Sequence, residues 1–517
     1  MSNRLFKRVF LIGVDGAGAF FKDTATPNID RIMKNGASTY EAITAIPSIS
    51  AQCWGSMLIG VEPDIHKLTN GYVEANVYPT DSPFPTVFRR IKEKYPDAVL
   101  ASFSNWDPIN HGIVEHNLDV TFASEGDDDL TVLIERYLDE NDPTFLFVQF
   151  DSVDGAGHRN GYGTEGHLSQ ITLVDSYIGR IYDKLASRGL IEDALFIVTA
   201  DHGGTPGGDH GGVTDAELKV YFAATGSEVV ENGTIGEMRV CDIPAVVLHA
   251  LGIDVPEFDV DGFTAQVPNG IFKGYTAVGR KRLPPIRFEH VHKPTPVGTL
   301  GDFVDESKVE SALFFDMDTG DVTGKHETSV NGTVKFYETG LYGQCAELGM
   351  RGSVVLPDVK LGTSSFTVSM WINRDGSLNG MDPSLYGTLD RAVDEVGMSF
   401  SYQGVICEFM VFNEKRGLDF VELQLPSRLE NGWFNTTLVV DREANTVTHY
   451  INFKNPKTEP MNESVRGVSF DGCPFTVGND TSGTDNNYVN MFMDDFILFN
   501  CALSEDEVKK LGEYYKQ

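Results

Sequence analysis

The chain has 517 residues, of which 41% are hydrophobic, and its formal net charge is −34 at pH 7. This length exceeds what one hydrophobic core usually serves, so we expect two or three domains. The strong negative charge argues against non-specific binding to nucleic acid or to an anionic membrane surface, because both need positive potential. We therefore expect neither a nucleic-acid polymer nor a membrane as a partner.

The six cysteines are scattered and form no Cys-x-x-Cys pair, which is typical of reduced thiols in an intracellular protein. The apolar run Val9–Val14 is shorter than the core of a signal peptide, and no small-residue cleavage site follows it. No stretch approaches the roughly 20 apolar residues of a membrane-spanning helix. The expectation is a cytoplasmic protein, and the sequence carries no signal for its oligomeric state.

Short apolar runs alternate with helical patterns over residues 1–285. A helix start is readable at Thr26-Pro27, and Leu168–Ala186 repeats apolar residues at helical spacing. Four runs lack polar alternation, which predicts strands buried on both faces; they are Val9–Val14, Ala98–Phe103, Thr144–Phe150 and Leu195–Ala200. This alternation predicts an α/β domain, in which a mostly parallel sheet is covered by helices on both faces.

The stretch Arg280–Thr299 is rich in proline and locally basic, which is typical of a connection between domains. We place a linker at residues 286–304, between a first domain of residues 1–285 and a second of residues 305–517. Segments of the second domain are short, β-branched or aromatic, and separated by Gly, Asn and Asp; they are Phe366–Ile372, Trp433–Asp441, Thr446–Phe453 and Val489–Phe499. This pattern predicts an all-β jelly-roll sandwich.

Side chains that commonly bind metal ions follow the predicted strands of the first domain. In chain order they are Asp15, then Asp154 with His158, then Asp201 with His202, and finally His210. In such sheets the functional residues gather beyond the carboxyl ends of the strands. Carboxylates and imidazoles in this mixture suit zinc, manganese or iron. A single Asp at a strand end is more often a turn former, so the joint order is what carries the prediction.

Ser50 lies in Pro-Ser-Ile-Ser, ahead of the helical-looking segment Cys53–Gly60. Two divalent ions about 4 Å apart can activate such a hydroxyl and neutralise the leaving oxygen of an in-line displacement. Ser48 is the less favoured nucleophile, with a turn or capping role as its alternative. Asp151 is the less favoured ligand, because only Asp154 stands four residues before a His.

The motifs GVDG, TPNID, a Pro-x-x-Ser element with LIGVEPDIH, DGAGH, TADHGG and DHGG occur in this order. Over residues 7–225 the chain thereby resembles the alkaline phosphatase superfamily, and within it the nucleotide pyrophosphatase/phosphodiesterase-like branch. The resemblance implies two divalent ions, zinc before manganese or iron. It assigns one ion to Asp154, His158 and His210. It assigns the other to Asp15, Asp201, His202 and the oxygen of Ser50, which would form a phosphoseryl intermediate.

Two departures from the family pattern bear on the site. The His-Gly pair that usually follows the nucleophile helix is His66-Lys67 here. The family often carries an Asn beyond that pair to stabilise the transferring phosphoryl oxygens. Asn70 is the nearest match, but it falls one position short, and a turn former in Thr-Asn-Gly is its alternative. The formylglycine pattern of sulfatases fits neither Ser50 nor Cys53.

Near these motifs the only basic side chains are Lys67 and Arg159, and a monoester brings an extra negative charge. The interpretation is therefore a phosphodiesterase or nucleotide pyrophosphatase that acts on a small-molecule phosphoester. A phosphomonoesterase or a phosphonate hydrolase on the same site is the alternative.

The segments FTVSMWI, WFNTTLVVD, THYINF and MDDFILFNCALSEDEVKKL occur in this order. Residues 305–517 thereby resemble concanavalin-like laminin-G domains. The resemblance implies a carbohydrate ligand, sometimes with calcium, for which Asp494 and Asp495 would supply oxygens. The simpler interpretation is that these aspartates only close a strand edge. A glycan- or partner-binding protein led by this sandwich is the rival functional class.

Overall fold

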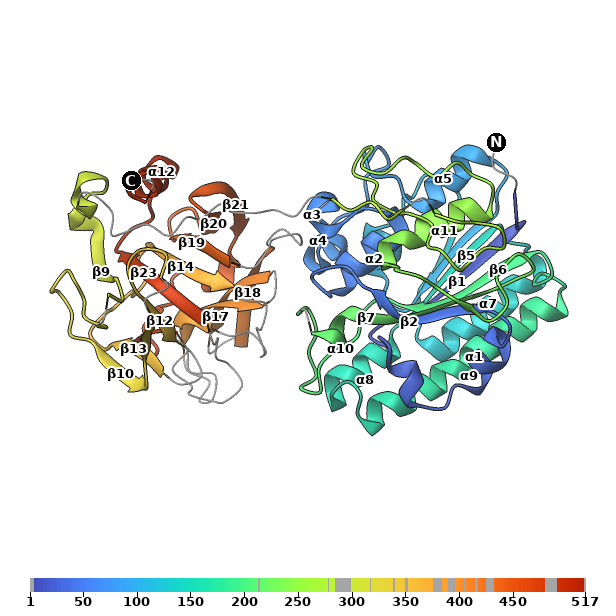
Figure 1. The fold of residues 1–517 in the computed structure, drawn as a ribbon, viewed down its shortest axis with the longest axis horizontal. Helices are drawn as coiled ribbons and strands as arrows, with labels where there is room; N and C mark the ends of the chain where they lie inside the picture. Colours follow the sequence, from blue (N-terminus) through green and yellow to red (C-terminus); the bar gives the residue numbers. More distant parts are fainter. Residues whose placement is uncertain are drawn as a thin grey trace. The chain divides into compact units, whose positions relative to one another are not determined.

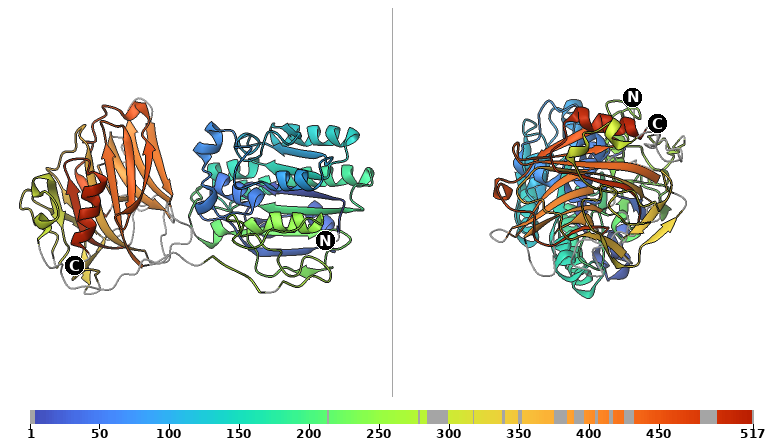
Figure 2. Two further views of the ribbon diagram at one scale, coloured as in Figure 1. Left: turned by 90° about the horizontal axis from the view of Figure 1, so that it is seen from above. Right: turned by 90° about the vertical axis from the view of Figure 1, so that its left-hand side faces the viewer.

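The structure is a computed structural model that describes residues 4–515 except 213, 278, 284–298, 317, 338–339, 349–351, 375–383, 389–395, 404–405, 414–416, 425–431 and 479–490. The chain divides into two compact units, Met1–Pro284 and Pro285–Gln517, which Figures 1 and 2 show as ribbons. Most of the linker predicted at residues 286–304 lies outside the described residues.

The strands of the N-terminal unit are β1 (Arg8–Val14), β2 (Ala37–Ile43), β3 (Leu100–Ser104), β4 (Val120–Ala123), β5 (Phe145–Phe150), β6 (Ala194–Ala200), β7 (Lys219–Thr225) and β8 (Gly233–Thr234). Within the described residues they form one sheet of order β4-β3-β5-β1-β6-β7-β2-β8. The first five strands of this order run parallel to one another, whereas β7 is antiparallel to β6 and to β2.

The α-helices of this unit are α1 (Pro27–Met33), α2 (Ser50–Ile59), α3 (Pro63–His66), α4 (Asn70–Ala75), α5 (Val87–Lys94), α6 (Pro108–Gly112), α7 (Asp127–Glu140), α8 (Ser152–Asn160), α9 (Glu165–Ser187), α10 (Asp215–Leu218) and α11 (Ile243–Ala250). Helices α1, α7 and α8 pack against α9 on one face of the sheet, and α2, α5 and α11 pack together on the other (Figure 1). This arrangement confirms the predicted α/β fold with helices on both faces.

The four predicted strands are present as β1, β3, β5 and β6, and nearly all of their residues are buried. Continuous apolar runs form such strands because neither face of a central parallel strand meets water. Strand β3 begins at Leu100, two residues later than predicted. The reason is a turn after α5, in which the amide of Ala98 donates to the carbonyl of Tyr95.

Helix α1 begins at Pro27, directly after the predicted cap residue Thr26, but the Thr26 side chain caps no amide. Instead, the carboxylate of Asp175 on α9 accepts hydrogen bonds from the amides of Asn28 (3.0 Å) and Ile29 (2.7 Å). A carboxylate at a helix N-terminus accepts hydrogen bonds from otherwise unpaired N–H groups and interacts favourably with the helix dipole. The α1–α9 contact therefore caps α1 through tertiary structure.

The strands of the C-terminal unit are β9 (Val309–Leu313), β10 (Ser329–Gly332), β11 (Lys335–Tyr337), β12 (Cys345–Leu348), β13 (Gly352–Leu356), β14 (Phe366–Arg374), β15 (Ser384–Gly387), β16 (Gly397–Gln403), β17 (Ile406–Asn413), β18 (Gly417–Gln424), β19 (Gly432–Asp441), β20 (Thr446–Ile451), β21 (Lys454–Pro460), β22 (Phe475–Val477) and β23 (Met491–Phe499), and its α-helix is α12 (Glu505–Tyr514). These strands form two antiparallel sheets, of order β10-β13-β22-β15-β16-β17-β18 and β11-β12-β23-β14-β19-β20-β21. This confirms the predicted β-sandwich.

Asp494 and Asp495, the residues considered for calcium, lie at a β-bulge where β23 pairs with β14. Asp495 has a φ of 42° there. One oxygen of Asp494, Oδ2, accepts hydrogen bonds from the amides of Leu341 and Tyr342, both at 3.0 Å. Among the described residues, the groups of three His, Cys, Asp or Glu side chains spaced for a metal ion do not include either aspartate. In the structure, Asp494 thus serves to hold the turn at Leu341–Tyr342.

Candidate metal centre and active site

The predicted site residues converge at the carboxyl ends of three neighbouring parallel strands. Asp15 follows β1, Asp154 and His158 lie on α8 after β5, and Asp201 and His202 follow β6. His210 lies in the loop between β6 and α10, and Ser50 is the first residue of α2. Neighbouring parallel strands end at the same edge of a sheet, so residues far apart in sequence meet there.

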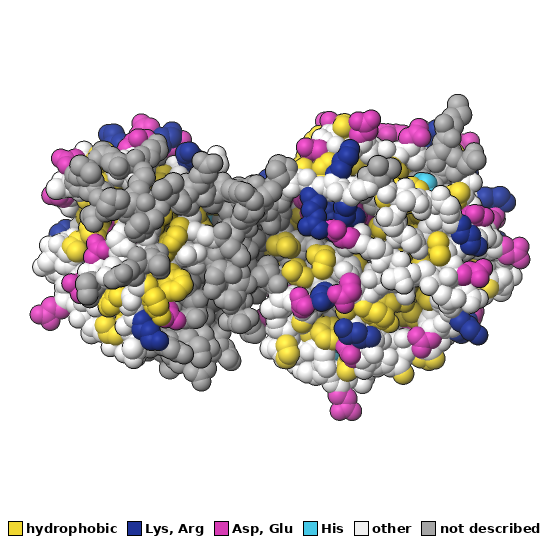
Figure 3. All heavy atoms as spheres, viewed as in Figure 1, with side chains coloured by type: hydrophobic (Ala, Val, Ile, Leu, Met, Phe, Trp, Pro, Cys, Tyr) yellow, Lys and Arg dark blue, Asp and Glu magenta, His cyan; other side chains and the backbone are white. Residues whose placement is uncertain are grey.

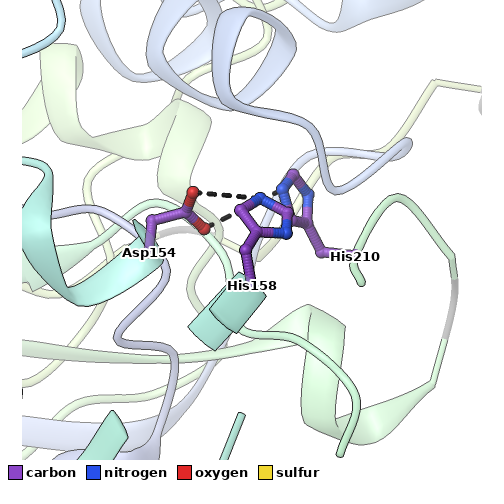
Figure 4. A group of neighbouring side chains, drawn as sticks. All are labelled: Asp154, His158 and His210. Carbon is purple, nitrogen blue, oxygen red and sulfur yellow. Dashed lines mark ion pairs between the residues drawn. The ribbon is translucent and has the colours of Figure 1, made fainter. Parts of the chain in front are cut away.

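Asp154, His158 and His210 form one group whose possible ligand atoms all lie within 4.8 Å of one another. Nε2 of His158 lies 3.2 Å from Oδ2 of Asp154, and Nε2 of His210 lies 3.8 Å from Oδ1. Figure 4 shows both imidazoles turned toward the carboxylate. One carboxylate and two imidazoles are a ligand set that zinc commonly uses when its fourth position stays open.

A second group with the same spacing consists of Asp15, Asp154 and His202. Nε2 of His202 lies 3.3 Å from Oδ1 of Asp15, 3.4 Å from Oδ2 of Asp201 and 3.4 Å from Oγ of Ser50. Asp154 belongs to both groups, although the sequence prediction assigned it to one ion only. The two groups are therefore adjacent and share a carboxylate. The predicted ligand Asp201 belongs to neither group, although its Oδ2 lies beside Nε2 of His202.

Each of the three imidazoles is oriented by a backbone carbonyl. Nδ1 of His158 lies 2.7 Å from the carbonyl oxygen of Gly208, and Nδ1 of His202 lies 2.9 Å from that of Gly203. Nδ1 of His210 lies 2.7 Å from the carbonyl oxygen of Ser48. A carbonyl oxygen only accepts, so each Nδ1 carries a proton and each Nε2 faces the site. The hydrogen bond of His158 to the Asp154 carboxylate raises the pKa of His158 to about 9. Imidazoles that bind metals in proteins are held in this way.

Two buried carboxylate oxygens in the site have no hydrogen-bond partner among the described residues: Oδ1 of Asp15 and Oδ2 of Asp201. The other oxygen of each carboxylate accepts hydrogen bonds. Oδ2 of Asp15 accepts from the side chains of Trp54 (2.8 Å) and Gln149 (2.9 Å). Oδ1 of Asp201 accepts from the amides of Gly16 and His202. A buried, unpaired carboxylate oxygen is costly unless a cation compensates it. These residues fit a bound divalent ion.

The electrostatics of the site support the same fit. Burial raises the pKa of Asp15 and of Asp201 well above the usual range, and the neighbouring charge of Asp154 adds to both shifts. Burial also lowers the pKa of His202 to about 3, so this imidazole is neutral near pH 7. The protein alone therefore crowds negative charge into a buried space, which divalent cations neutralise where they bind.

Ser50 and Ser48 are both buried, but they differ in their partners. Oγ of Ser50 faces Nε2 of His202 at 3.4 Å. Oγ of Ser48 donates to the carbonyl of Gly212 and accepts from the amide of Gly211, both at 3.0 Å. The Ser48 hydroxyl thus connects its own loop to the loop that carries His210. The Ser50 hydroxyl, by contrast, faces an imidazole of the candidate metal centre.

Asn70 is the first residue of α4, and its Oδ1 accepts a 3.0 Å hydrogen bond from the amide of Ala51. Its carboxamide therefore lies beside the residue that follows Ser50. His66 lies elsewhere, since its Nδ1 accepts from the amide of Leu68 and its Nε2 bonds to Ser56. Asp151 belongs to neither metal-type group, and its Oδ1 accepts from Gln149 at 3.1 Å.

Three residues that build the site were not predicted from the sequence: Trp54, Gln149 and Tyr162. The side chains of Trp54 and Gln149 bind Asp15, and the hydroxyl of Tyr162 binds Asp154. Gln149 did carry a signal, because an amide inside the apolar run FLFVQF requires a buried polar partner. The aromatic residues carried none, because an aromatic residue in an apolar segment usually belongs to the core.

The charge on the outside of this unit is mixed. Figure 3 shows acidic and basic side chains interspersed over one face of it, without a broad basic patch in that view. The chain as a whole is acidic. A polyanion would find little positive potential on such a face.

Family models match both units. Residues 9–249 match the model described as type I phosphodiesterase/nucleotide pyrophosphatase, and residues 348–509 match that of the concanavalin A-like lectin/glucanase superfamily. Among solved structures, murine ectonucleotide pyrophosphatase/phosphodiesterase 5 aligns with a TM-score of 0.41 and 15% identity. That alignment covers 48% of this chain and 97% of the murine chain.

Curated relatives include GPI ethanolamine phosphate transferases. That of Aspergillus fumigatus, transferase 2, is 21% identical over 224 residues, which are 42% of this chain and 29% of the relative. The catalytic subunit of human transferase 3 is 29% identical over 139 residues, which are 26% of this chain and 11% of the relative. The chain thus spans less than a third of the length of these relatives.

These relatives overturn the expectation of a cytoplasmic protein, because they are named for GPI, a glycolipid of membranes. Composition and cysteine spacing did not indicate this, because neither determines the compartment in which a protein acts. In the part of the chain that the structure describes, no helix is both long and apolar enough to cross a membrane. By these matches, the N-terminal unit is similar to type I phosphodiesterases/nucleotide pyrophosphatases, and the C-terminal unit is similar to concanavalin A-like lectins and glucanases.

Proposed function

We propose that the N-terminal unit cleaves phosphodiesters with two divalent metal ions and with Ser50 as the nucleophile. The observation that carries this proposal is the pair of unpartnered, buried oxygens on Asp15 and Asp201. Nε2 of His202 lies 3.3 Å from the Asp15 oxygen and 3.4 Å from the Asp201 oxygen. The family match over residues 9–249 supports an enzyme that acts on phosphoesters.

One ion would be held by Asp154, His158 and His210, and the other by Asp15, Asp201, His202 and the Ser50 oxygen. Zinc suits this set best, and manganese and iron share these ligand types. When bound, the ions would lower the pKa of the Ser50 hydroxyl and neutralise the oxygen that leaves phosphorus.

The residues would then act in two displacements. In the first, Oγ of Ser50 gives up its proton and forms a bond to phosphorus while the bond from phosphorus to the leaving oxygen breaks, and that oxygen takes up a proton and departs as an alcohol. In the second, a water oxygen attacks phosphorus, and Ser50 departs with its hydroxyl restored. The amide of Ala51 holds the carboxamide oxygen of Asn70 next to Ser50, so that the carboxamide nitrogen of Asn70 would donate to the phosphoryl oxygens in the transition state.

The charge of the site favours a diester over a monoester. Among the described residues, neither Lys nor Arg contributes to the hydrogen bonds and ion pairs that hold Asp15, Asp154, Asp201 and His202. Two divalent ions, partly neutralised by these carboxylates, can balance the single negative charge of a diester. A monoester dianion would need a further cation. Phosphomonoesterase and phosphonate hydrolase activity are the alternatives on the same residues.

Transfer to an alcohol is the second candidate, favoured by the names of the curated relatives, which are ethanolamine phosphate transferases. The chemistry differs only in the second displacement, where an acceptor hydroxyl would replace water. Turnover of a diester in the presence of increasing ethanol would separate the two. A constant yield of free phosphate monoester favours hydrolysis, and an ethyl diester product that grows with ethanol concentration favours transfer.

The main proposal is tested by metal analysis together with hydrolysis of bis-p-nitrophenyl phosphate by the full chain. We expect two ions per chain, release of p-nitrophenol that requires them, and loss of turnover in Ser50→Ala. Ser176→Ala, an exposed serine on α9 whose hydroxyl bonds only its own helix, is the matched control. A metal-free chain without turnover, or a Ser50→Ala variant as active as wild type, would contradict the proposal.

For the C-terminal unit we propose a carbohydrate ligand, on the strength of the match to concanavalin A-like lectins and glucanases. A glycan array probed with the full chain would test it. Binding to a defined glycan supports the proposal. Silence across the array would contradict it and favour a structural role for the sandwich.

A further inference from the structure

We propose that Tyr162 is a positioning residue for the metal site, because its hydroxyl and ring hold the Asp154 carboxylate against His158 and His210. This inference rests on the proposed function, since it assumes a divalent ion on those three side chains. Tyr162 itself would not touch the ion or the substrate. It acts through Asp154, the carboxylate that both metal-type groups share.

The first observation is a short hydrogen bond. The hydroxyl of Tyr162 donates to Oδ1 of Asp154 at 2.5 Å, and only 1% of the tyrosine is exposed. A hydrogen bond to a carboxylate is stronger than one between neutral groups. It fixes the carboxylate plane, while Oδ2 lies 3.2 Å from Nε2 of His158. The bond therefore orients Asp154 toward its neighbouring ligand.

The second observation is a slot between two glycines that admits the tyrosine ring. A Cβ atom added to Gly157 would lie 2.4 Å from a ring carbon of Tyr162, and one added to Gly204 would also lie 2.4 Å from the ring. Neither distance is sterically allowed, so the ring can lie here only because both positions are glycine. Gly157 belongs to α8, and Gly204 follows Asp201-His202-Gly203.

The third observation is that Tyr162 joins two segments that carry ligands. Its ring centre lies 5.8 Å from that of His158 on α8 and 6.1 Å from that of His210. Its amide donates to the carbonyl of Thr205, in the loop between His202 and His210. Helix α8 and this loop follow different strands, so a contact between them is needed to fix the distance between the ligands that they carry. Tyr162 is placed to be that spacer.

Outer residues that orient metal ligands typically change metal affinity by about 10- to 100-fold when they are replaced. The test uses the full chain, stripped of metal with a chelator and then titrated with Co²⁺. Visible absorption of Co²⁺ reports both affinity and ligand geometry. We expect Tyr162→Phe, which keeps the ring, to weaken one of two sites by about 10-fold or more and to shift its absorption band.

Gly204→Ala provides a second, independent variant, because it retains the hydroxyl but pushes the ring out of its slot. It should weaken the same site. Tyr177→Phe on α9 is the matched control, since that ring packs on Phe150 and not on the site; its affinity and spectrum should equal those of wild type. Circular dichroism of the metal-free variants would establish that each is folded.

Wild-type affinity and spectrum in both Tyr162→Phe and Gly204→Ala would overturn the positioning role and leave the two-metal proposal standing. A wild-type chain that binds no divalent ion would overturn the two-metal proposal, and the positioning role with it. A general loss of stability without a spectral change would identify Tyr162 as a packing residue and would also overturn the role.

Discussion

The carbonyl oxygen of Ser48 lies 2.7 Å from Nδ1 of His210, so the loop before the nucleophile helix holds a metal-type ligand that stands 162 residues later in the chain. The Ser48 hydroxyl strengthens this connection through Gly211 and Gly212. A residue that the sequence offered as a rival nucleophile therefore has a different place in the structure. It helps to fix the distance between Ser50 and His210.

Ser48→Ala should weaken metal binding without removing the nucleophile. The change deletes two hydrogen bonds to buried backbone groups, which typically costs about 1–3 kcal/mol where a partner is left unsatisfied. We expect lower affinity at the ion held by His210, and activity that returns at high metal concentration. Isothermal titration with zinc and turnover at increasing zinc would check this. Loss of turnover that excess zinc cannot restore would instead favour Ser48 as the nucleophile.

Asp15→Asn should have opposite effects on the metal-free and metal-loaded protein. Without metal, the substitution removes a buried ionisable group whose pKa is raised by burial and by the charges of Asp201 and Asp154, so thermal stability should rise by a few degrees. With zinc, each bound ion should add about 2.7 kcal/mol at a hundredfold excess over its Kd, and the variant should lose the contribution of the site that contains Asp15. Thermal melts in chelator and in zinc measure both effects. Equal melting temperatures for wild type and variant under both conditions would contradict this account.

Asn70→Ala should lower kcat with little change in KM. If the carboxamide acts mainly in the transition state, its loss should cost about 10²- to 10³-fold in kcat, as for other lost oxyanion donors. Steady-state kinetics on bis-p-nitrophenyl phosphate would show it, with Asn76→Ala at the end of α4 as the control. Among the described contacts, the side chain of Asn76, directly after α4, donates to the carbonyl of Tyr72. A kcat that stays at the wild-type value would return Asn70 to the role of a turn former.

The C-terminal unit should lose stability as pH rises from about 4 to about 9. Burial raises the pKa of Asp494 to about 9 and that of Asp495 to about 8, each with help from neighbouring carboxylates. In the unfolded chain an Asp has a pKa of about 3.9. Folding therefore favours the protonated form of both carboxyl groups. Their contribution to the free energy of unfolding is complete below the pKa of the unfolded chain and is lost as pH rises through the pKa values of the folded protein. Each titrating proton changes stability by at most about 1.4 kcal/mol per pH unit.

Thermal unfolding of the full chain at several pH values would measure this decline, with Asp494→Asn as the comparison. The variant keeps an oxygen that can accept from Leu341 and Tyr342, and it cannot ionise. Its C-terminal transition should depend less on pH than that of the wild type. A wild-type transition that rises toward pH 8 would contradict the account.

Much of the fold could be predicted because its signals are local. Continuous apolar runs mark β1, β3, β5 and β6, and the Asp and His residues directly after three of these strands meet because parallel strands end at one edge of the sheet. The sharing of Asp154 between both groups was not predictable, since it depends on how α8 is oriented above the sheet. The cap that Asp175 supplies to α1 was missed for a similar reason, because it arises from tertiary contact and not from the neighbouring sequence.

The most direct measurement of the central claim is mass spectrometry of the zinc-loaded chain, quenched in acid during turnover of a phosphodiester. The account predicts a covalent phosphoryl adduct on the peptide that contains Ser50, located at Ser50 by fragmentation. This adduct should be absent in Ser50→Ala and after chelation. An adduct on Ser48, or full turnover by Ser50→Ala, would contradict the account.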